Sequence, residues 1–152
     1  MRDHEAILHK VARAFSPAAC DQDDLVQEIR LAIWRGVTGF NGRSQPSSYI
    51  YRIALNRAIS WKRRLRTYRA KLDHYETEKT NATTGSYRSD PRLEIVYAEI
   101  RRLNDAERSL ILLQLDGFSY EDIAETLGLT PSNVGVRLAR IRAKLAQRLK
   151  GK

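Results

Sequence analysis

The chain has 152 residues, of which 42% are hydrophobic and 30% are charged, and 27 Lys and Arg against 18 Asp and Glu give a net charge of +9. This length allows one medium domain or two small ones. No apolar run approaches the roughly 20 residues that cross a bilayer, the N-terminus lacks the apolar segment of a secretory signal, and the single Cys20 excludes an internal disulfide. We therefore expect a soluble, cytoplasmic protein.

Signatures of enzymatic chemistry are missing from the sequence. The histidines and the cysteine lack metal-ligand spacing, and there is no glycine-rich phosphate-binding loop and no G-x-S-x-G nucleophile elbow. A DNA-processing enzyme would need carboxylate metal ligands near its basic surface, whereas the acids lie elsewhere. We expect no catalytic residue, no metal and no cofactor, and a protein that is not itself an enzyme.

Positive charge is concentrated in two tracts. No Asp or Glu occurs between Ile29 and Leu72, or from Thr126 to the end, and both tracts are rich in Lys and Arg. Because phosphates dominate nucleic-acid affinity, two basic surfaces indicate two contacts with a polyanion. Solvated helix faces are the alternative, and a membrane is disfavoured because neither tract has a continuous apolar face opposite its charge. We expect DNA or RNA as the partner, and no membrane.

The first block of the chain predicts three helices. Apolar residues at helical spacing place them over His4–Phe15, from the acidic cluster at 21–24 to about residue 35, and from Pro46 to about residue 66. A glycine-containing loop over 36–45 precedes the third helix. The expected buried face of the third helix consists of Ile50, Ile53, Ala54, Ala58, Trp61 and Leu65.

Two helix faces in this block carry side chains that suggest binding surfaces. Aromatic, cationic and amide side chains line one side of the third helix: Tyr49, Arg52, Asn56, Ser60 and Arg63. Such a stripe can stack on unpaired bases and hold phosphates, and an ordinary solvated face is the alternative. On the second helix Leu31 and Trp34 lie opposite the core, which favours a protein–protein contact, unless Trp34 packs under the third helix.

The rest of the chain predicts a linker followed by four helices. Residues 77–91 are rich in Thr, Ser and Asn without apolar periodicity, which predicts a flexible linker. Four helices are then expected: 93–103, one capped by Asn104 with Glu107 and closed by Gly117, one opened by Ser119, and one capped by Thr130. The expected core of the helix before Gly117 is Leu110, Ile111, Leu113 and Leu115.

Ala124, Gly128 and Val134 have the spacing of a helix-turn-helix, with a plain helical hairpin as the alternative. The second helix of such a unit usually enters the DNA major groove. At about 100° per residue, the core side of this helix is Val134, Leu138, Ile141 and Leu145. Asn133 and Arg140 are then the best candidates for base edges, whereas Arg137 is expected to hold a phosphate or a local acid.

Together, the two blocks resemble a bacterial RNA polymerase sigma factor of the sigma-70 family, in its small extracytoplasmic-function (ECF) group. The segment DDLVQEIRLAIWR (23–35) is similar to the family's polymerase-binding helix, YIYRIALNRAISWKRR (49–64) to its −10 reader, and 103–145 to its −35 reading domain. The resemblance implies an all-α fold of two small helical domains: a region 2 helical bundle over 1–70, a flexible linker over 71–92, and a region 4 helix-turn-helix over 93–152.

The resemblance also implies roles for individual residues. Core polymerase, through its β′ clamp coiled coil, would bind Asp24, Gln27, Glu28, Leu31 and Trp34. The −10 element would be read by Phe40, Asn41, Arg43, Tyr49, Arg52, Asn56 and Arg63. The −35 element would be read by Thr130, Ser132, Asn133, Val136, Arg137 and Arg140, while the same domain touches the β flap. The implied function is promoter-specific initiation of transcription, and small members commonly have an anti-sigma factor as a further partner.

Two positions depart from the family pattern. Gly135 stands where a basic residue is common, and Ser60 stands where Asp is common, which bears on the promoter sequence that is read. A free-standing helix-turn-helix regulator that binds operators without polymerase is the competing interpretation. It explains the second block but neither the stripe on the third helix nor the Leu31–Trp34 pair.

Overall fold

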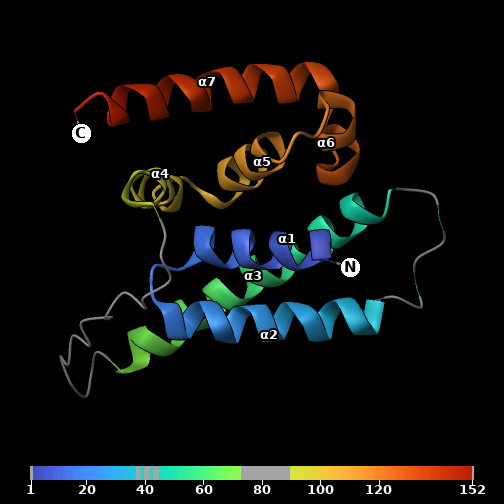
Figure 1. The fold of residues 1–152 in the computed structure, drawn as a ribbon, viewed down its shortest axis with the longest axis vertical. Coiled ribbons are helices and arrows are strands. Elements are labelled where there is room, and N and C mark those ends of the chain that lie inside the picture. The colour runs from blue at the N-terminus through green and yellow to red at the C-terminus, as the bar shows by residue number, and fades with distance from the viewer. Residues whose placement is uncertain (1, 37–38, 40–41, 43–44, 73–89, 152) are drawn as a thin grey trace.

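The computed structural model describes residues 2–36, 39, 42, 45–72 and 90–151, which form seven α-helices and no strand (Figure 1). The helices are α1 (Arg2–Phe15), α2 (Ala19–Gly36), α3 (Pro46–Leu72), α4 (Pro91–Arg101), α5 (Asp105–Leu115), α6 (Tyr120–Leu127) and α7 (Pro131–Leu149). No helix among these described residues is long and apolar enough to cross a membrane. The predicted all-α fold is confirmed, and most of the predicted linker lies outside the described residues.

Helices α1, α2 and α3 pack against one another and form the first half of the molecule. Helix α3 continues to Leu72, beyond the predicted end near residue 66, because residues 60–72 contain no Gly or Pro to stop it. Two ion pairs hold the C-terminal part of α3 against α2. Arg64 pairs with Glu28, and Arg69 Nη2 lies 3.0 Å from Asp21 Oδ2.

The predicted caps of α5, α6 and α7 are confirmed, whereas α4 begins and ends two residues earlier than the predicted 93–103. Asn104 and Glu107 form a reciprocal capping box at the start of α5, with the Glu107 N–H donating to Asn104 Oδ1 at 2.8 Å. The hydroxyls of Ser119 and Thr130 cap α6 and α7. Gly128 closes α6 with φ of 72°, a left-handed conformation that glycine adopts without steric cost. Local hydrogen bonding therefore sets these helix ends.

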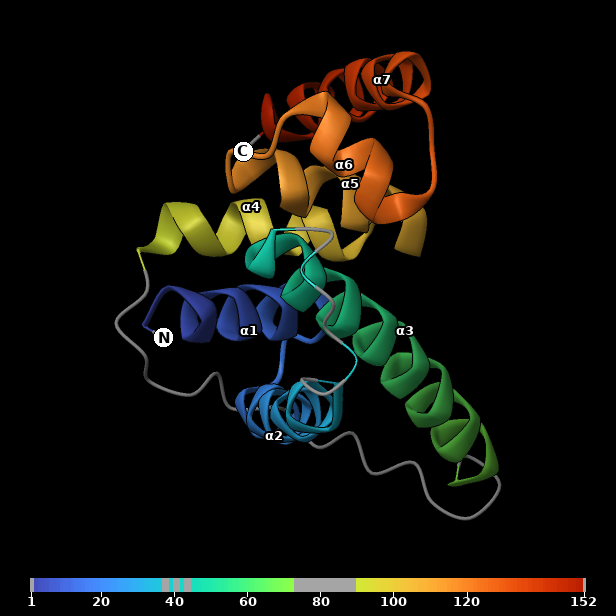
Figure 2. The ribbon, with the colours of Figure 1, turned by 90° about the vertical axis from the view of Figure 1, so that its right-hand side faces the viewer.

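The two halves pack directly against each other. Helices α4 and α5 lie against α1, and α5 and α6 lie against α3, so that α7 and α2 form opposite outer layers (Figures 1 and 2). Buried hydrophobic residues from both halves join in one continuous core. Where the halves meet, the ring of Tyr51 contacts the ring of Phe118 edge-on, with centroids 5.3 Å apart.

Predictions of the core fail where the two halves meet. Leu115, expected inside, is 63% exposed, whereas Leu112 is buried. Helix α5 lies between the first half and helices α6 and α7, so more than one of its faces is covered and residues 108–113 are buried without a gap. Tyr51 and Leu55 are also buried, although only the other side of α3 was expected to face a core.

Candidate nucleic-acid interface

The stripe on α3 is present as a solvent-facing surface. Arg52, Asn56, Ser60 and Arg63 are exposed along one side of the helix. Tyr49 is half-buried, and its hydroxyl donates to the carbonyl oxygen of Gly36 at 2.5 Å. The tyrosine therefore joins the start of α3 to the end of α2, and its ring is held at the edge of the stripe. The loop residues predicted to act with this stripe, Phe40, Asn41 and Arg43, lie outside the described residues.

The second half covers one edge of this stripe. Arg52, Leu55 and Asn56 border a hollow of about 280 Å³ whose opposite wall is the end of α6, residues 126–128. Direct packing of α6 on α3 forms this wall. With the two halves packed together, the open space in front of Arg52 and Asn56, two of the predicted −10 readers, is reduced to this small hollow.

The apolar pair on α2 is exposed. Trp34 has 80% of its surface accessible and Leu31 has 55%, which excludes the alternative that Trp34 packs under α3. Asp24 and Gln27 are exposed beside them. Glu28 is half-buried and accepts a hydrogen bond from Arg64. This glutamate thus holds α3 to α2, in addition to bordering the surface that we call the α2 face (Asp24, Gln27, Glu28, Leu31 and Trp34).

Helix α7 has the predicted division into an inner and an outer side. Its core residues Val134, Leu138, Ile141 and Leu145 are buried. The candidate DNA-reading residues are all exposed: Thr130, Ser132, Asn133, Val136, Arg137 and Arg140. Arg137, expected to hold a phosphate or an acid, donates from Nε to Asn133 Oδ1 at 2.9 Å. The amide oxygen of Asn133 is therefore oriented by its neighbour one turn along.

Gly135 lies where α7 passes the aromatic ring of Tyr120 on α6. A Cβ atom at this position would lie 3.4 Å from Tyr120 Cε2. A side chain would require the ring to shift by a few tenths of an ångström, so the glycine allows close packing of the two helices of the motif. The Tyr120 hydroxyl in turn accepts a hydrogen bond from Arg142 Nη2 at 2.7 Å.

A polar cluster that sequence reasoning missed joins the two halves. The hydroxyl of the fully buried Tyr51 donates to Asp116 Oδ2 at 2.6 Å, and Lys10 Nζ lies 2.6 Å from Asp116 Oδ1. Although burial alone would raise the pKa of Asp116, the hydrogen bonds from Lys10 and Tyr51 hold it below its usual value. Burial and the adjacent carboxylate raise the pKa of Tyr51. No signal in the sequence pairs residues so far apart.

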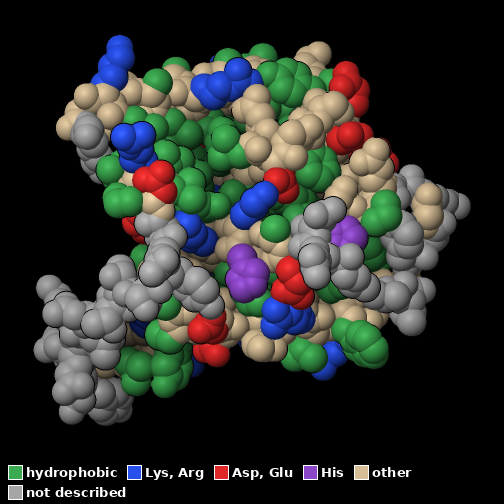
Figure 3. Space-filling view, viewed as in Figure 1, with side chains coloured by type: hydrophobic (Ala, Val, Ile, Leu, Met, Phe, Trp, Pro, Cys, Tyr) green, Lys and Arg blue, Asp and Glu red, His purple; other side chains and the backbone are tan. Residues whose placement is uncertain are grey.

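A second polar cluster lies at the junction of the two halves, between α1 and α4. Glu94 accepts hydrogen bonds from Arg13 Nη2 and Arg101 Nη1, both at 2.8 Å. Arg101 Nε also donates to the backbone carbonyl of Arg13 at 2.9 Å. Figure 3 shows acidic and basic side chains next to one another across the middle of this face, where the halves meet. Burial opposes ionisation of Glu94, yet the two arginines lower its pKa.

These carboxylates predict that docking depends on pH. Hydrogen bonds across the junction of the halves lower the pKa of Asp116 and of Glu94. Both carboxylates therefore stabilise the docked arrangement at pH values above their undocked pKa of about 4. This stabilisation is lost as the pH falls through the lowered values. We expect the radius of gyration to stay constant from about pH 7 to 5 and to rise below about pH 4, while helical circular dichroism persists. A radius that changes only together with the helical signal would contradict this.

The comparison with known proteins identifies the family. The chain matches the models described as sigma-70 region 2, over residues 1–68, and sigma-70 region 4, over residues 93–145. It is 33% identical to the RNA polymerase sigma factor NccH of Alcaligenes xylosoxydans xylosoxydans, over 93% of this chain and 80% of that protein. The chain belongs to the sigma-70 family. A further relative of this sigma factor is the ECF RNA polymerase sigma factor SigM of Mycobacterium tuberculosis, 29% identical over 97% of this chain and 74% of that protein.

The fold agrees with this assignment. The sigma factor RpoE of Bartonella quintana, solved in complex with the anti-sigma factor NepR, superimposes with a TM-score of 0.75 at 25% identity, over 97% of this chain and 92% of that one. Region 2 of the present sigma factor corresponds to α1–α3 and region 4 to α4–α7. The surfaces described above therefore lie in the two regions that define the family.

Proposed function

We propose that this sigma factor binds core RNA polymerase through the α2 face, reads the −10 element with α3 and reads the −35 element with α7. Membership in the family makes it a promoter-recognition subunit; the assignment of residues is our inference. The main support for this assignment is the arrangement of α7. This helix buries its apolar side and presents Asn133, Val136 and Arg140 to solvent. The polymerase supplies the chemistry, so we assign no catalytic residue to this chain.

Each face has the chemistry that its role requires. An exposed tryptophan and leucine bordered by polar groups fit a protein partner, for which we propose the β′ clamp coiled coil, with the β flap as a contact of region 4. The arginine and asparagine side chains of the α3 stripe suit unpaired bases and phosphates, and the loop with Phe40, Asn41 and Arg43 is proposed to act with them on a flipped base. Such work on chromosomal DNA places the protein in the cytoplasm.

Promoter binding also requires a change in the arrangement of the halves. The end of α6 borders the hollow in front of Arg52 and Asn56, so a movement of region 4 away from α3 would give a DNA strand the room to lie along these residues. The structural relative RpoE was solved with an anti-sigma factor, and we propose that a partner of this class also binds the present chain. Such a partner would act by holding the two regions where they cannot engage polymerase and promoter together.

Run-off transcription tests the function. Core polymerase from a bacterium should produce specific transcripts from genomic promoter fragments only when this protein is added, and the start sites would reveal both elements. The absence of transcripts, combined with tight duplex binding by the protein alone, would instead identify an operator-binding regulator.

Replacing Arg140 with Ala is expected to relax specificity at one base pair of the −35 element. A bidentate arginine contact to guanine is worth about 1–3 kcal/mol of discrimination, and Arg140 is exposed on the side of α7 that we propose faces DNA. Binding to duplexes with each base substituted in turn would measure this. Lys150→Ala, at the far end of the same helix, is the control and should weaken all duplexes equally. A uniform loss for Arg140→Ala would mean that it contacts a phosphate.

A further inference from the structure

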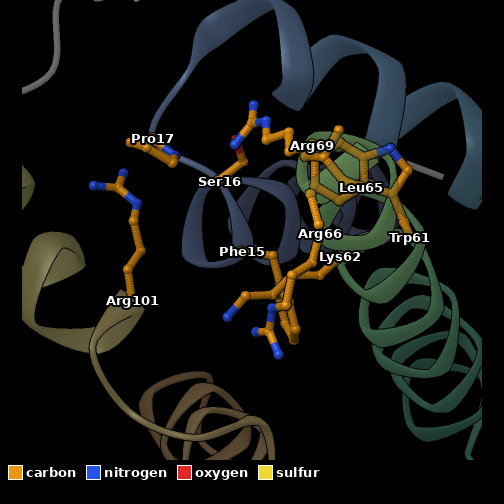
Figure 4. Close-up of a pocket in the computed structure, with 10 residues that line it drawn as sticks. Phe15, Ser16, Pro17, Trp61, Lys62, Leu65, Arg66, Arg69 and Arg101 are labelled. Carbon is orange, nitrogen blue, oxygen red and sulfur yellow. The ribbon is translucent and has the colours of Figure 1, made fainter. Parts of the chain in front are cut away.

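A hollow at the junction of the two regions has no part in the function proposed above. It has a volume of about 490 Å³, within the usual range of small-molecule sites. Its walls come from the end of α1, the C-terminal half of α3 and Arg101 at the end of α4. Figure 4 shows Arg101 on the α4 side, separated by the hollow from the side chains of α1 and α3.

The hollow combines an apolar floor with an excess of positive charge. Phe15, Trp61 and Leu65 supply aromatic and aliphatic surface, and the residues that line it include no Asp or Glu. Its cationic side chains are Lys62, Arg66, Arg69 and Arg101. A planar apolar group can lie against such a floor while an anionic group meets the cations.

The cations are only partly neutralised by the protein. Arg69 is paired with Asp21, whereas Lys62 lies 3.8 Å from Asp105, a carboxylate that also accepts a hydrogen bond from the buried Arg108. Burial and the neighbouring arginines lower the pKa of Lys62, the effect expected where positive charge lacks compensation.

Two guanidinium groups have unused hydrogen-bonding capacity. Arg101 Nη2 is buried and has no hydrogen-bond partner among the described residues. Arg66 forms no hydrogen bond or ion pair within that part of the chain. A buried donor without a partner is unfavourable, so an anion that accepted a hydrogen bond from Arg101 Nη2 would remove this cost. Arg66 is exposed and could donate to the same anion.

This surface is distinct from the proposed DNA-reading stripe. At about 100° per residue, Lys62, Arg66 and Arg69 are centred roughly 120° around α3 from the stripe of Asn56, Ser60 and Arg63. The hollow therefore lies on the core side of α3, beyond the point where α1 ends and no longer covers that side. A duplex lying on the stripe would not fill it.

We propose that this hollow binds a free nucleotide, with its phosphates between Arg101 and Arg66 and its base against Trp61 and Leu65. Arginine forks match phosphate oxygens bidentately, and two or more net positive charges suit a phosphate dianion or a polyphosphate. Because the cations come from both regions, the site is complete only when the regions are docked. Nucleotide binding must therefore stabilise the docked arrangement.

Fluorescence provides a direct test on the whole chain without polymerase. The sequence has two tryptophans, so Trp34→Phe leaves Trp61 as the only one. We expect ATP or GTP to change the Trp61 signal saturably and to raise the unfolding temperature, and inorganic pyrophosphate to bind more weakly because it lacks a base. Arg66→Gln should weaken binding about tenfold, the loss of one charge-assisted contact. Arg92→Gln, an exposed arginine away from the hollow, is the matched control and should change little.

Four outcomes would overturn the proposal. Absence of saturable binding at millimolar nucleotide excludes the site. Equal losses for Arg66→Gln and Arg92→Gln would indicate general attraction to polyanions, and equal affinity for pyrophosphate and nucleotide would exclude a role for the base. Promoter duplex that competes for the Trp61 signal and loses affinity in Arg66→Gln would assign the cations to DNA phosphates. These measurements use free protein, so they stand or fall separately from the transcription assay.

Discussion

Trp34→Ala is expected to weaken binding to core polymerase by about 2 kcal/mol or more, roughly 30-fold, as for a central aromatic residue at an interface. The side chain is 80% exposed in the free protein, so its removal opens no cavity and stability should change little. Binding to a −35 duplex should be unaffected, because α7 lies on the opposite side of the molecule (Figure 1). Titration of labelled protein with core polymerase measures the first effect.

Tyr68→Ala provides the matched control for this substitution. Tyr68 is another aromatic residue with 60% of its surface exposed, but it lies near the end of α3 and outside the α2 face. We expect unchanged polymerase affinity in this variant. If Trp34→Ala also left the affinity unchanged, the assignment of the α2 face to polymerase would be wrong.

Arg108→Met is expected to lower the free energy of unfolding by about 3–5 kcal/mol, the usual cost of removing one member of a buried charged network. Arg108 is 1% exposed. Its guanidinium donates to the carbonyl oxygens of Arg101 and Leu103 at 3.0 and 2.6 Å, and to Asp105 Oδ1 at 2.7 Å. Methionine fills similar space but leaves these acceptors without a donor.

The same guanidinium lies over the ring of Phe15, with Cζ 4.6 Å from the ring centroid. Arg108 thus closes the end of α4 and also contacts the first half, so its loss should affect both. Urea unfolding measures the change, with the exposed Arg92→Met as the control, for which we expect less than about 0.5 kcal/mol. A loss below about 1 kcal/mol for Arg108→Met would show that water replaces the guanidinium at these carbonyls.

The predictions that succeeded rest on short-range physics. A helix cap joins residues three positions apart, so Asn104, Ser119 and Thr130 could be identified from the sequence alone. The two sides of α7 follow from helical periodicity, which placed Val134 inside and Arg140 outside. The exposed Trp34 was predicted in the same way, from its position opposite the apolar stripe of α2.

The predictions that failed concern residues at the junction of the halves. The apolar pattern of α5 predicts that Leu115 is buried, but its side chain faces solvent and is 63% exposed. Tyr51, Leu55 and Leu112 are buried because α3 and α5 each have more than one covered face, whereas periodicity predicts a single buried face for each helix. Tyr51 and Leu55 belong to α3 and Leu112 belongs to α5, and both helices pack against elements of their own half and of the other half.

The sequence predicts the helices, the caps of α5, α6 and α7, the helix-turn-helix and the outward faces of α2, α3 and α7, because each depends on periodicity and on neighbours within about one helical turn. Only the tertiary structure decided how the halves dock, that Asp116 accepts from both Tyr51 and Lys10, and that cations from α3 and α4 surround one hollow. These contacts join residues separated by 32 to more than 100 positions. Their pairing follows from shape and burial in the folded chain, and no local pattern specifies it.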